Sequence, residues 1–119
     1  MSTITNGNLK EIWELIESKL EINQEPYQEL KAVYEFQLTD HEGEVYQLEF
    51  ENSGVNIHTQ SEKVADCTLK MKEKYFRKFL LGDLNSTTAF MTGKLKVDGN
   101  IGMALKLEGL LKKYNFTEE

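Results

Sequence analysis

The sequence predicts an α+β fold in which an antiparallel sheet is covered by helices on one face. Two observations support this prediction. The stretches at 8–22 and 100–114 carry apolar residues at helical spacing, whereas the segments between 32 and 71 alternate apolar and polar residues. Such alternation is typical of strands that bury one face and expose the other. Short turn sequences join these segments, and no repeat or linker divides the chain. We therefore expect a single domain over residues 1–119.

The first predicted helix covers residues 8–22. Asn8 is a favourable N-cap residue, and Glu11 three positions later completes a capping box. Pro26 lies in the segment that interrupts the chain after this helix, and it marks either a stop or a new start of regular structure there. The apolar residues of the helix share one stripe: Leu9, Ile12, Trp13, Ile16 and Leu20.

Four strands are predicted next, at 32–39, 45–52, 55–60 and 66–71. The turn sequence "DHEGE" between the first two predicts a hairpin. The side chains expected to face the core are Tyr34, Phe36, Leu38, Tyr46, Leu48, Phe50, Val55, Ile57 and Thr59.

The second half supplies the remaining cover for the sheet. Residues 72–84 predict a helix with an aromatic stripe, and 85–93 predict a short helical turn capped by Ser86 or Thr87. A short fifth strand is expected at 93–99, and a last helix at 100–114 with Asn100 as its cap. We expect the tail at 115–119 to be frayed.

The last helix is apolar around most of its circumference. Only four of its residues are charged, whereas a surface helix needs an apolar stripe little more than about 100° wide. Such a helix is either buried on two sides or lines an apolar space, and its composition leaves both readings open. Gly102 and Gly109 each cost a helix roughly 1 kcal/mol, which predicts a bend or a close backbone approach.

Charge is unevenly spread along the chain. The net charge is −6, with −10 on residues 1–62 and +4 on residues 63–119. An acidic total argues against nucleic-acid binding, which depends on neutralising phosphates. A local basic cluster fits either a solvated face or a contact with an anionic headgroup or a phosphate-bearing ligand. It comprises Lys70, Lys72, Lys74, Arg77 and Lys78.

The sequence predicts neither an enzyme nor a bound cofactor or metal. It lacks the HExxH, G-x-S-x-G and Walker-type motifs, and His41 and His58 fall in a turn and on a polar strand face. Cys67 fits a small buried hydrophobe better than a reactive thiol. One cysteine and no secretory signal predict a cytoplasmic protein.

Two stretches resemble the sterol carrier protein 2 family, also called non-specific lipid-transfer proteins. They are "ADCTLKM" (65–71) and, above all, "FMTGKLKVDGNIGMALKL" (90–107), where a Gly-Lys-Leu-Lys strand leads through Gly-Asn into a Met/Ala/Leu helix. The predicted elements also follow the family order along nearly the whole chain. Because the chain has no peroxisomal ending, it is similar to a free-standing, bacterial-type member.

This resemblance implies a five-stranded, mostly antiparallel sheet covered on one face by helices, with an apolar tunnel between the layers. In the family this tunnel takes up fatty acids, fatty acyl-CoAs or sterols, so the resemblance implies a non-catalytic lipid carrier that makes transient contact with membrane surfaces. An accessory or interaction module, whose last helix docks on a partner or a second copy, is the alternative. The residues expected to line the tunnel are Trp13, Ile16, Leu20, Phe76, Phe79, Leu80, Phe90, Met91, Met103, Leu107, Leu110 and Leu111.

Overall fold

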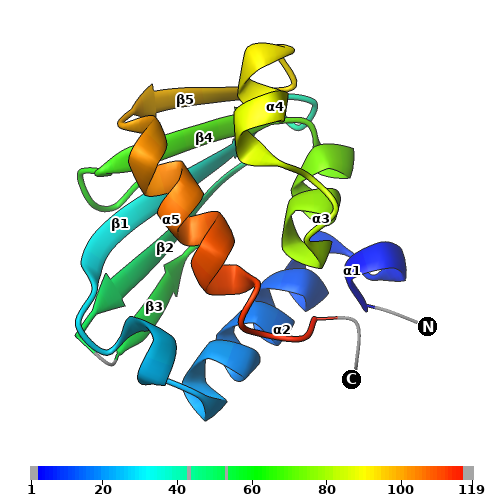
Figure 1. Ribbon diagram of the computed structural model, residues 1–119. Helices are drawn as coiled ribbons and strands as arrows, with labels where there is room; N and C mark the ends of the chain where they lie inside the picture. The colour runs from blue at the N-terminus through cyan, green and yellow to red at the C-terminus, as the bar shows by residue number, and fades with distance from the viewer. Residues whose placement is uncertain (1–2, 43, 53, 117–119) are drawn as a thin grey trace.

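A five-stranded sheet with helices on one face forms the two layers of the computed structural model (Figure 1). The structure describes residues 3–42, 44–52 and 54–116. The strand order is β3-β2-β1-β4-β5. The strands are β1 (Lys31–Leu38), β2 (Val45–Glu51), β3 (Val55–His58), β4 (Cys67–Met71) and β5 (Leu95–Gly99).

Three of the four strand pairs are antiparallel, as the sequence predicts. β1 pairs with β2, β2 with β3, and β4 with β5 in this way, while β1 and β4 are parallel. The parallel pair arises because the chain passes through β2 and β3 before it returns to the other side of β1. A parallel pair needs such a long connection, whereas the antiparallel pairs are closed by short turns.

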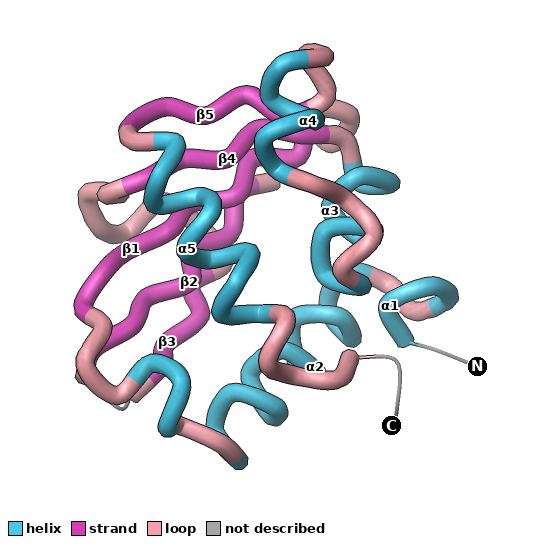
Figure 2. The backbone as a smooth tube through the Cα atoms, viewed as in Figure 1, coloured by secondary structure: helices cyan, strands magenta, loops and turns pink. Residues whose placement is uncertain are grey.

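The helices are α1 (Thr3–Asn6), α2 (Leu9–Ile22), α3 (Glu73–Leu81), α4 (Ser86–Met91) and α5 (Ile101–Leu111), with a 3₁₀ turn η1 at Glu25–Tyr27. Figure 2 shows α2, α3 and α5 on the same side of the sheet. α2 begins as the sequence predicts, because the Asn8 side chain accepts from the Glu11 N–H and the Glu11 carboxylate accepts from the Asn8 N–H. α1 is not among the predicted helices, since four residues are too few for helical periodicity to appear.

Two helix ends differ from the prediction for local reasons. α3 stops at Leu81 because Gly82 adopts φ 79°, and its N–H satisfies the last carbonyls of the helix. α4 is capped by Asn85 and not by Ser86 or Thr87, since the Asn85 side chain accepts from the Thr88 N–H at 2.9 Å.

The core lies between the two layers and is rich in aromatic rings. The Trp13 ring lies 5.6 Å from the Phe36 ring and 5.5 Å from the Phe76 ring, and the Phe36 and Phe79 rings lie 6.4 Å apart. These contacts join α2 and α3 to the centre of the sheet. Thr59, expected to face the core, is exposed because β3 ends one residue earlier.

The outer face of the sheet is less open than the alternating pattern predicts. Gln47 and Glu35 are buried there, because the segment 59–66 lies against them. The Gln47 amide donates to the Lys63 carbonyl at 2.7 Å and to Glu35 at 2.9 Å, and it accepts from the Lys63 N–H at 3.0 Å. The Ser61 hydroxyl donates to Glu35 at 2.8 Å. This loop is held by polar groups, which hydrophobic periodicity does not detect.

The C-terminal segment also differs from the expectation of a frayed tail. Phe116 is buried and packs beside Tyr114, whose hydroxyl donates to the Asn23 carbonyl. Residues 117–119, which the same prediction covers, lie outside the described residues.

Candidate functional site

The sequence predicts that the last helix, α5, is either buried on two sides or lines an apolar space. In the structure, the protein's own sheet and helices cover most of the apolar surface of α5. Ala104, Leu107, Leu110 and Leu111 are buried, while Leu105 is 42% exposed. The Tyr34 hydroxyl on β1 donates to the Met103 carbonyl at 3.1 Å, which ties the first turn of α5 to the sheet. α5 therefore forms a wall of the space between the two layers.

Neither glycine of α5 lies against the backbone of a neighbouring element, so the close backbone approach predicted for them is absent. Gly102 lies beside its capping residue: the Asn100 side chain accepts from the Gly102 N–H at 2.7 Å, and a Cβ at Gly102 would lie 3.0 Å from the same oxygen. Gly109 faces outward, and a Cβ there would meet no neighbouring atom within 4 Å. The structure gives no packing reason for Gly109.

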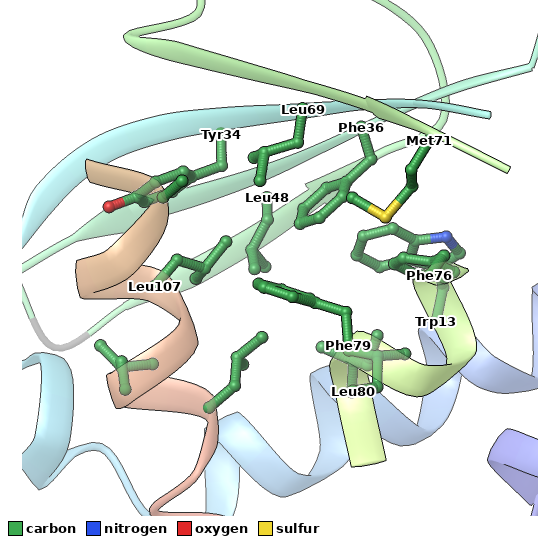
Figure 3. Packing of buried hydrophobic residues seen from close by; sticks show 14 of the residues in the cluster. Trp13, Tyr34, Phe36, Leu48, Leu69, Met71, Phe76, Phe79, Leu80 and Leu107 are labelled. Carbon is green, nitrogen blue, oxygen red and sulfur yellow. The ribbon is translucent and has the colours of Figure 1, made fainter. Parts of the chain in front are cut away.

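The structure brings most of the predicted lining residues together in the space between the layers. Met103 is partly buried at its edge. Those that are buried there are Trp13, Ile16, Leu20, Phe76, Phe79, Leu80, Leu107, Leu110 and Leu111. Figure 3 shows Leu48 of the sheet, Leu107 of α5 and Phe79 of α3 pointing into the same space. We call this space the inter-layer interior.

Phe90 and Met91 do not belong to the inter-layer interior, which corrects their predicted placement. They are 45% and 79% exposed, respectively. The reason is the orientation of α4, whose buried residues are Ser86 and Ala89. The Glu108 carboxylate accepts from the Ser86 N–H at 2.9 Å and fixes which side of this short helix faces inward.

A groove opens at one edge of the inter-layer interior, between α2 and the β2–β3 end of the sheet. Its volume is about 400 Å³, within the range of small-molecule sites. The groove is lined by Lys10, Trp13, Glu14, Glu17, Glu44, Val45, Tyr46, Ile57 and Thr59. Trp13 belongs to both spaces, because its ring stacks on Tyr46 in the groove and on Phe76 in the core. The groove thus leads from solvent to the aromatic core.

The indole N–H of Trp13 is a buried donor without a partner among the described residues. Buried polar groups are usually hydrogen-bonded, so this N–H is available to donate to an oxygen atom of a ligand. The charged residues that surround the groove were not predicted as site residues. They lie on the solvent side of α2 and in the β1–β2 turn, where charged residues are ordinary.

The remaining reactive groups are buried or paired. Cys67 is fully buried, and burial together with Asp98 and Asp66 raises the pKa of its thiol, which keeps it protonated at neutral pH. His41 pairs with Glu73, and His58 lies 2.9 Å from Glu49. Within residues 3–42, 44–52 and 54–116, no group of three or more His, Cys, Asp or Glu side chains is placed to hold a metal ion. No helix in the described chain has the length and hydropathy to cross a membrane.

The fold and the site together define a small α+β domain with an apolar core between sheet and helices, and with a groove that reaches this core at Trp13. Comparison with known proteins identifies its family. Residues 12–112 match the SCP-2 sterol transfer family, and the chain therefore belongs to this family.

Similar proteins agree with this assignment. The chain is 34% identical to the mouse (Mus musculus) hydroxysteroid dehydrogenase-like protein 2 over 92% of its own length and 22% of that protein. It thus spans about a fifth to a quarter of the length of the curated relatives that it matches. The apo structure of sterol carrier protein 2 from Yarrowia lipolytica superimposes with a TM-score of 0.73 at 27% identity, covering 92% of this chain and 91% of that one.

A second solved structure has the same fold at lower identity. It is the Aedes aegypti sterol carrier protein 2 in complex with the C16 fatty acid palmitate, with a TM-score of 0.64 and 19% identity. The match covers 86% of this chain and 96% of that one.

Proposed function

We propose that this chain binds a lipid in the inter-layer interior and carries it without changing it chemically. The observation that supports this most is the location of nine predicted lining residues in one apolar space of a domain that belongs to the SCP-2 family. The palmitate bound by the Aedes aegypti protein supports a long acyl chain as the ligand class. Fatty acids, fatty acyl-CoAs and sterol-like molecules all offer the apolar surface that such a space requires.

Burial of the acyl chain supplies the affinity. Removing a 16-carbon chain from water gains about 0.8 kcal/mol per methylene, or roughly 12 kcal/mol in total. Association and ordering cost about 4–15 kcal/mol, which leaves affinities from weak to submicromolar. No catalytic group is needed for this function. Because the gain comes from chain length, we expect chain length to affect affinity more than the detailed structure of the chain does.

We place the polar end of the lipid at the groove. Trp13 lines the groove, and its indole N–H is buried beside it without a partner among the described residues, so a lipid that enters past the rim can reach this donor. The rim carries three carboxylates, Glu14, Glu17 and Glu44, against one lysine, Lys10. This charge favours a neutral oxygen, such as a hydroxyl or ester, over a carboxylate as the group that accepts from Trp13.

The alternative function, docking of α5 on a partner, has less support. An interaction helix must present an apolar face, and most of the apolar face of α5 is already buried in this chain. Only Leu105 of its leucines is exposed by more than a third.

The single tryptophan permits a direct test. Trp13 is the only tryptophan in the sequence, and bromine atoms on an acyl chain quench indole fluorescence at contact distance. We expect a brominated C16 lipid to quench Trp13 with saturation, and the matching unbrominated lipid not to do so. A brominated acid of about four carbons should not quench at the same concentration, because its chain gains too little on burial.

The control moves the reporter to the opposite side of the molecule. In a Trp13→Phe/Val64→Trp double variant, the new indole replaces an exposed residue of the outer-face loop, so a chain bound inside should not quench it. Native mass spectrometry of gently purified protein should show lipid adducts at the monomer mass. Equal quenching of both reporters, or no quenching together with no adduct, would contradict lipid carriage.

A further inference from the structure

A second pocket, of about 290 Å³, lies where the end of β4, the start of α3, and the junction of α4 and β5 meet. Its lining contains four lysines and no carboxylate. The lining residues are Thr39, Lys70, Met71, Lys72, Tyr75, Thr92, Gly93, Lys94 and Lys96. The whole chain has a net charge of −6, so this concentration of positive charge runs against the overall balance.

Three of these lysines occupy positions that cost stability. Lys70 on β4 and Lys96 on β5 are direct cross-strand partners, and like charges at such positions repel. Lys72 is the N-cap residue of α3 and makes no side-chain capping bond, although the N-terminus of a helix disfavours positive charge.

Protection of a sheet edge explains only part of the cluster. β5 is an edge strand, and lysines there discourage pairing with another chain, which accounts for Lys94 and Lys96. Lys70 lies on β4, which has a strand on either side, and Lys72 lies on no strand. Lys70 interacts with the Glu35 carboxylate and helps to lower its pKa, so Glu35 offsets part of the repulsion between Lys70 and Lys96. A bound anion would relieve the rest and would also neutralise Lys72.

Exposed apolar side chains adjoin the lysines. Phe90 and Met91 directly precede Thr92 and Gly93 of the pocket. The turn is held in place because the Lys94 N–H donates to the Ala89 carbonyl at 2.9 Å and the Gly93 N–H donates to the Phe90 carbonyl at 3.3 Å. Figure 1 shows α4 beside β5 at one end of the molecule, at the opposite edge of the sheet from β3.

We propose that this surface docks the protein on an anionic lipid bilayer. We define it as the α4–β5 surface: Lys70, Lys72, Lys94, Lys96, Phe90 and Met91. The lysines contact headgroup phosphates, while Phe90 and Met91 enter the boundary between headgroups and acyl chains. Tyr75 also lines the pocket, and the ammonium groups of Lys74 and Lys94 lie over its ring at 5.1 and 5.7 Å from the ring centre. The inference rests on the proposed function, because a lipid carrier must meet a membrane to load or unload.

Charge and apolar exposure together favour a bilayer as the partner. A soluble phosphate compound would satisfy the lysines but leave Phe90 and Met91 in water. A bilayer supplies both anionic groups and an apolar layer, so it can contact the lysines and the exposed Phe90 and Met91 together. A nucleic acid also offers phosphates, and the test below separates it from a bilayer.

The first experiment measures cosedimentation with vesicles. The full chain should bind vesicles that contain roughly one third phosphatidylglycerol and should bind pure phosphatidylcholine vesicles poorly. Replacing Lys70, Lys72, Lys94 and Lys96 with Gln should weaken binding to the anionic vesicles about tenfold or more, and added salt should weaken wild-type binding. The matched control replaces Lys31, Lys78, Lys106 and Lys113, which are exposed outside both the groove and the α4–β5 surface, with Gln. Both quadruple variants carry the same net charge, so only a local effect separates them.

A second pair of variants tests the apolar contribution. Phe90→Ser/Met91→Ser should weaken vesicle binding several-fold, whereas Ile22→Ser/Val64→Ser should not. Ile22 and Val64 are also exposed apolar residues, but they lie outside the α4–β5 surface. Circular dichroism should show that all four variants fold.

The bilayer proposal and the lipid-carrier proposal can fail separately. Quenching of Trp13 by a brominated lipid, measured without vesicles, should be the same in the wild type and the α4–β5 lysine variant. No quenching in the wild type, together with no lipid adduct at the monomer mass, would overturn lipid carriage only. Equal binding of the wild type to neutral and anionic vesicles would overturn bilayer docking. So would an equal loss of vesicle binding in the α4–β5 lysine variant and in its matched lysine control. Binding of single-stranded RNA by the wild type, lost in the lysine variant, with no vesicle binding by either, would also overturn it.

Discussion

The carboxylate of Glu108 on α5 accepts a hydrogen bond from the backbone N–H of Ser86, the first residue of α4, at 2.9 Å. Glu108 is 8% exposed, and the Lys112 ammonium lies 2.9 Å from its other oxygen. One buried carboxylate therefore holds α4 against α5. The same contact turns Phe90 and Met91 outward, so it determines the composition of the α4–β5 surface.

The charge of Glu108 should make stability sensitive to acid. Burial raises the pKa of this carboxyl group, but the hydrogen bonds from Ser86 and Lys112 outweigh burial, so the pKa lies below its usual value of 4.5. A group whose pKa is lowered by folding stabilises the protein above its unfolded pKa, and that stabilisation is lost as the pH falls through the folded pKa. Glu108→Gln should cost about 1–2 kcal/mol in free energy of unfolding at neutral pH and less below pH ~4.

Urea unfolding followed by circular dichroism at several pH values measures this effect. Glu29→Gln, at an exposed position, is the matched control and should change stability by less than about 0.5 kcal/mol. A Glu108→Gln protein as stable as the wild type at neutral pH would show that the charge does not hold α4 in place.

The hydrogen bond from Tyr34 to the Met103 carbonyl should stabilise the packing of α5 on the sheet. Tyr34 is fully buried, and Tyr34→Phe removes only the hydroxyl. We expect a loss of about 1 kcal/mol, with the secondary structure unchanged. Tyr75→Phe, at a partly buried ring on α3, is the control and should be nearly neutral. An unchanged urea midpoint in Tyr34→Phe would contradict this role.

The Tyr34 phenol should also ionise at a higher pH than an ordinary tyrosine does. Burial raises the pKa of Tyr34 to about 12, with further contributions from Cys67 and Asp66, and burial together with Tyr27 raises the pKa of Tyr114 to about 12. Because these pKa values are higher in the folded protein, the stabilisation is present at neutral pH and is lost as the pH rises from about 10 to about 12. An absorbance titration of phenolate should show fewer tyrosines ionising near pH 10 than the sequence contains. Tyr34→Phe should remove amplitude only from the late phase.

The aromatic core should tolerate truncation far less well than the exposed side of α5. Phe76 is fully buried between Trp13 and Phe36, so Phe76→Ala should cost about 3–5 kcal/mol and abolish folding if total stability is small. Leu105→Ala, at a helical position that is 42% exposed, should cost less than about 1 kcal/mol. Thermal unfolding of the two variants measures the difference. A similar cost for both would contradict the assignment of Phe76 to the core.

The sequence predicts the elements that hydrophobic periodicity and capping define. α2 is an example, because Asn8, Glu11 and the stripe through Ile16 all agree with each other and with the structure. The outer-face loop could not be predicted, since Gln47 and Glu35 are held by hydrogen bonds to a distant segment. The outward position of Met91 could not be predicted from the sequence either. α4 is six residues long, and its orientation depends on Glu108, which lies 22 residues from Ser86 in the sequence.

The charge around the groove leads to a prediction on lipid selectivity. If the polar end of the lipid lies beside Trp13, the carboxylates of Glu14, Glu17 and Glu44 repel an anionic headgroup. A brominated C16 alcohol should therefore quench Trp13 at several-fold lower concentration than the brominated C16 acid of the same chain. Glu14→Gln/Glu17→Gln should narrow this difference, mainly by strengthening binding of the acid. Glu25→Gln/Glu29→Gln, which makes the same change in charge outside the groove, should not. An acid that binds more tightly than the alcohol in the wild type would place the headgroup elsewhere, away from the groove rim.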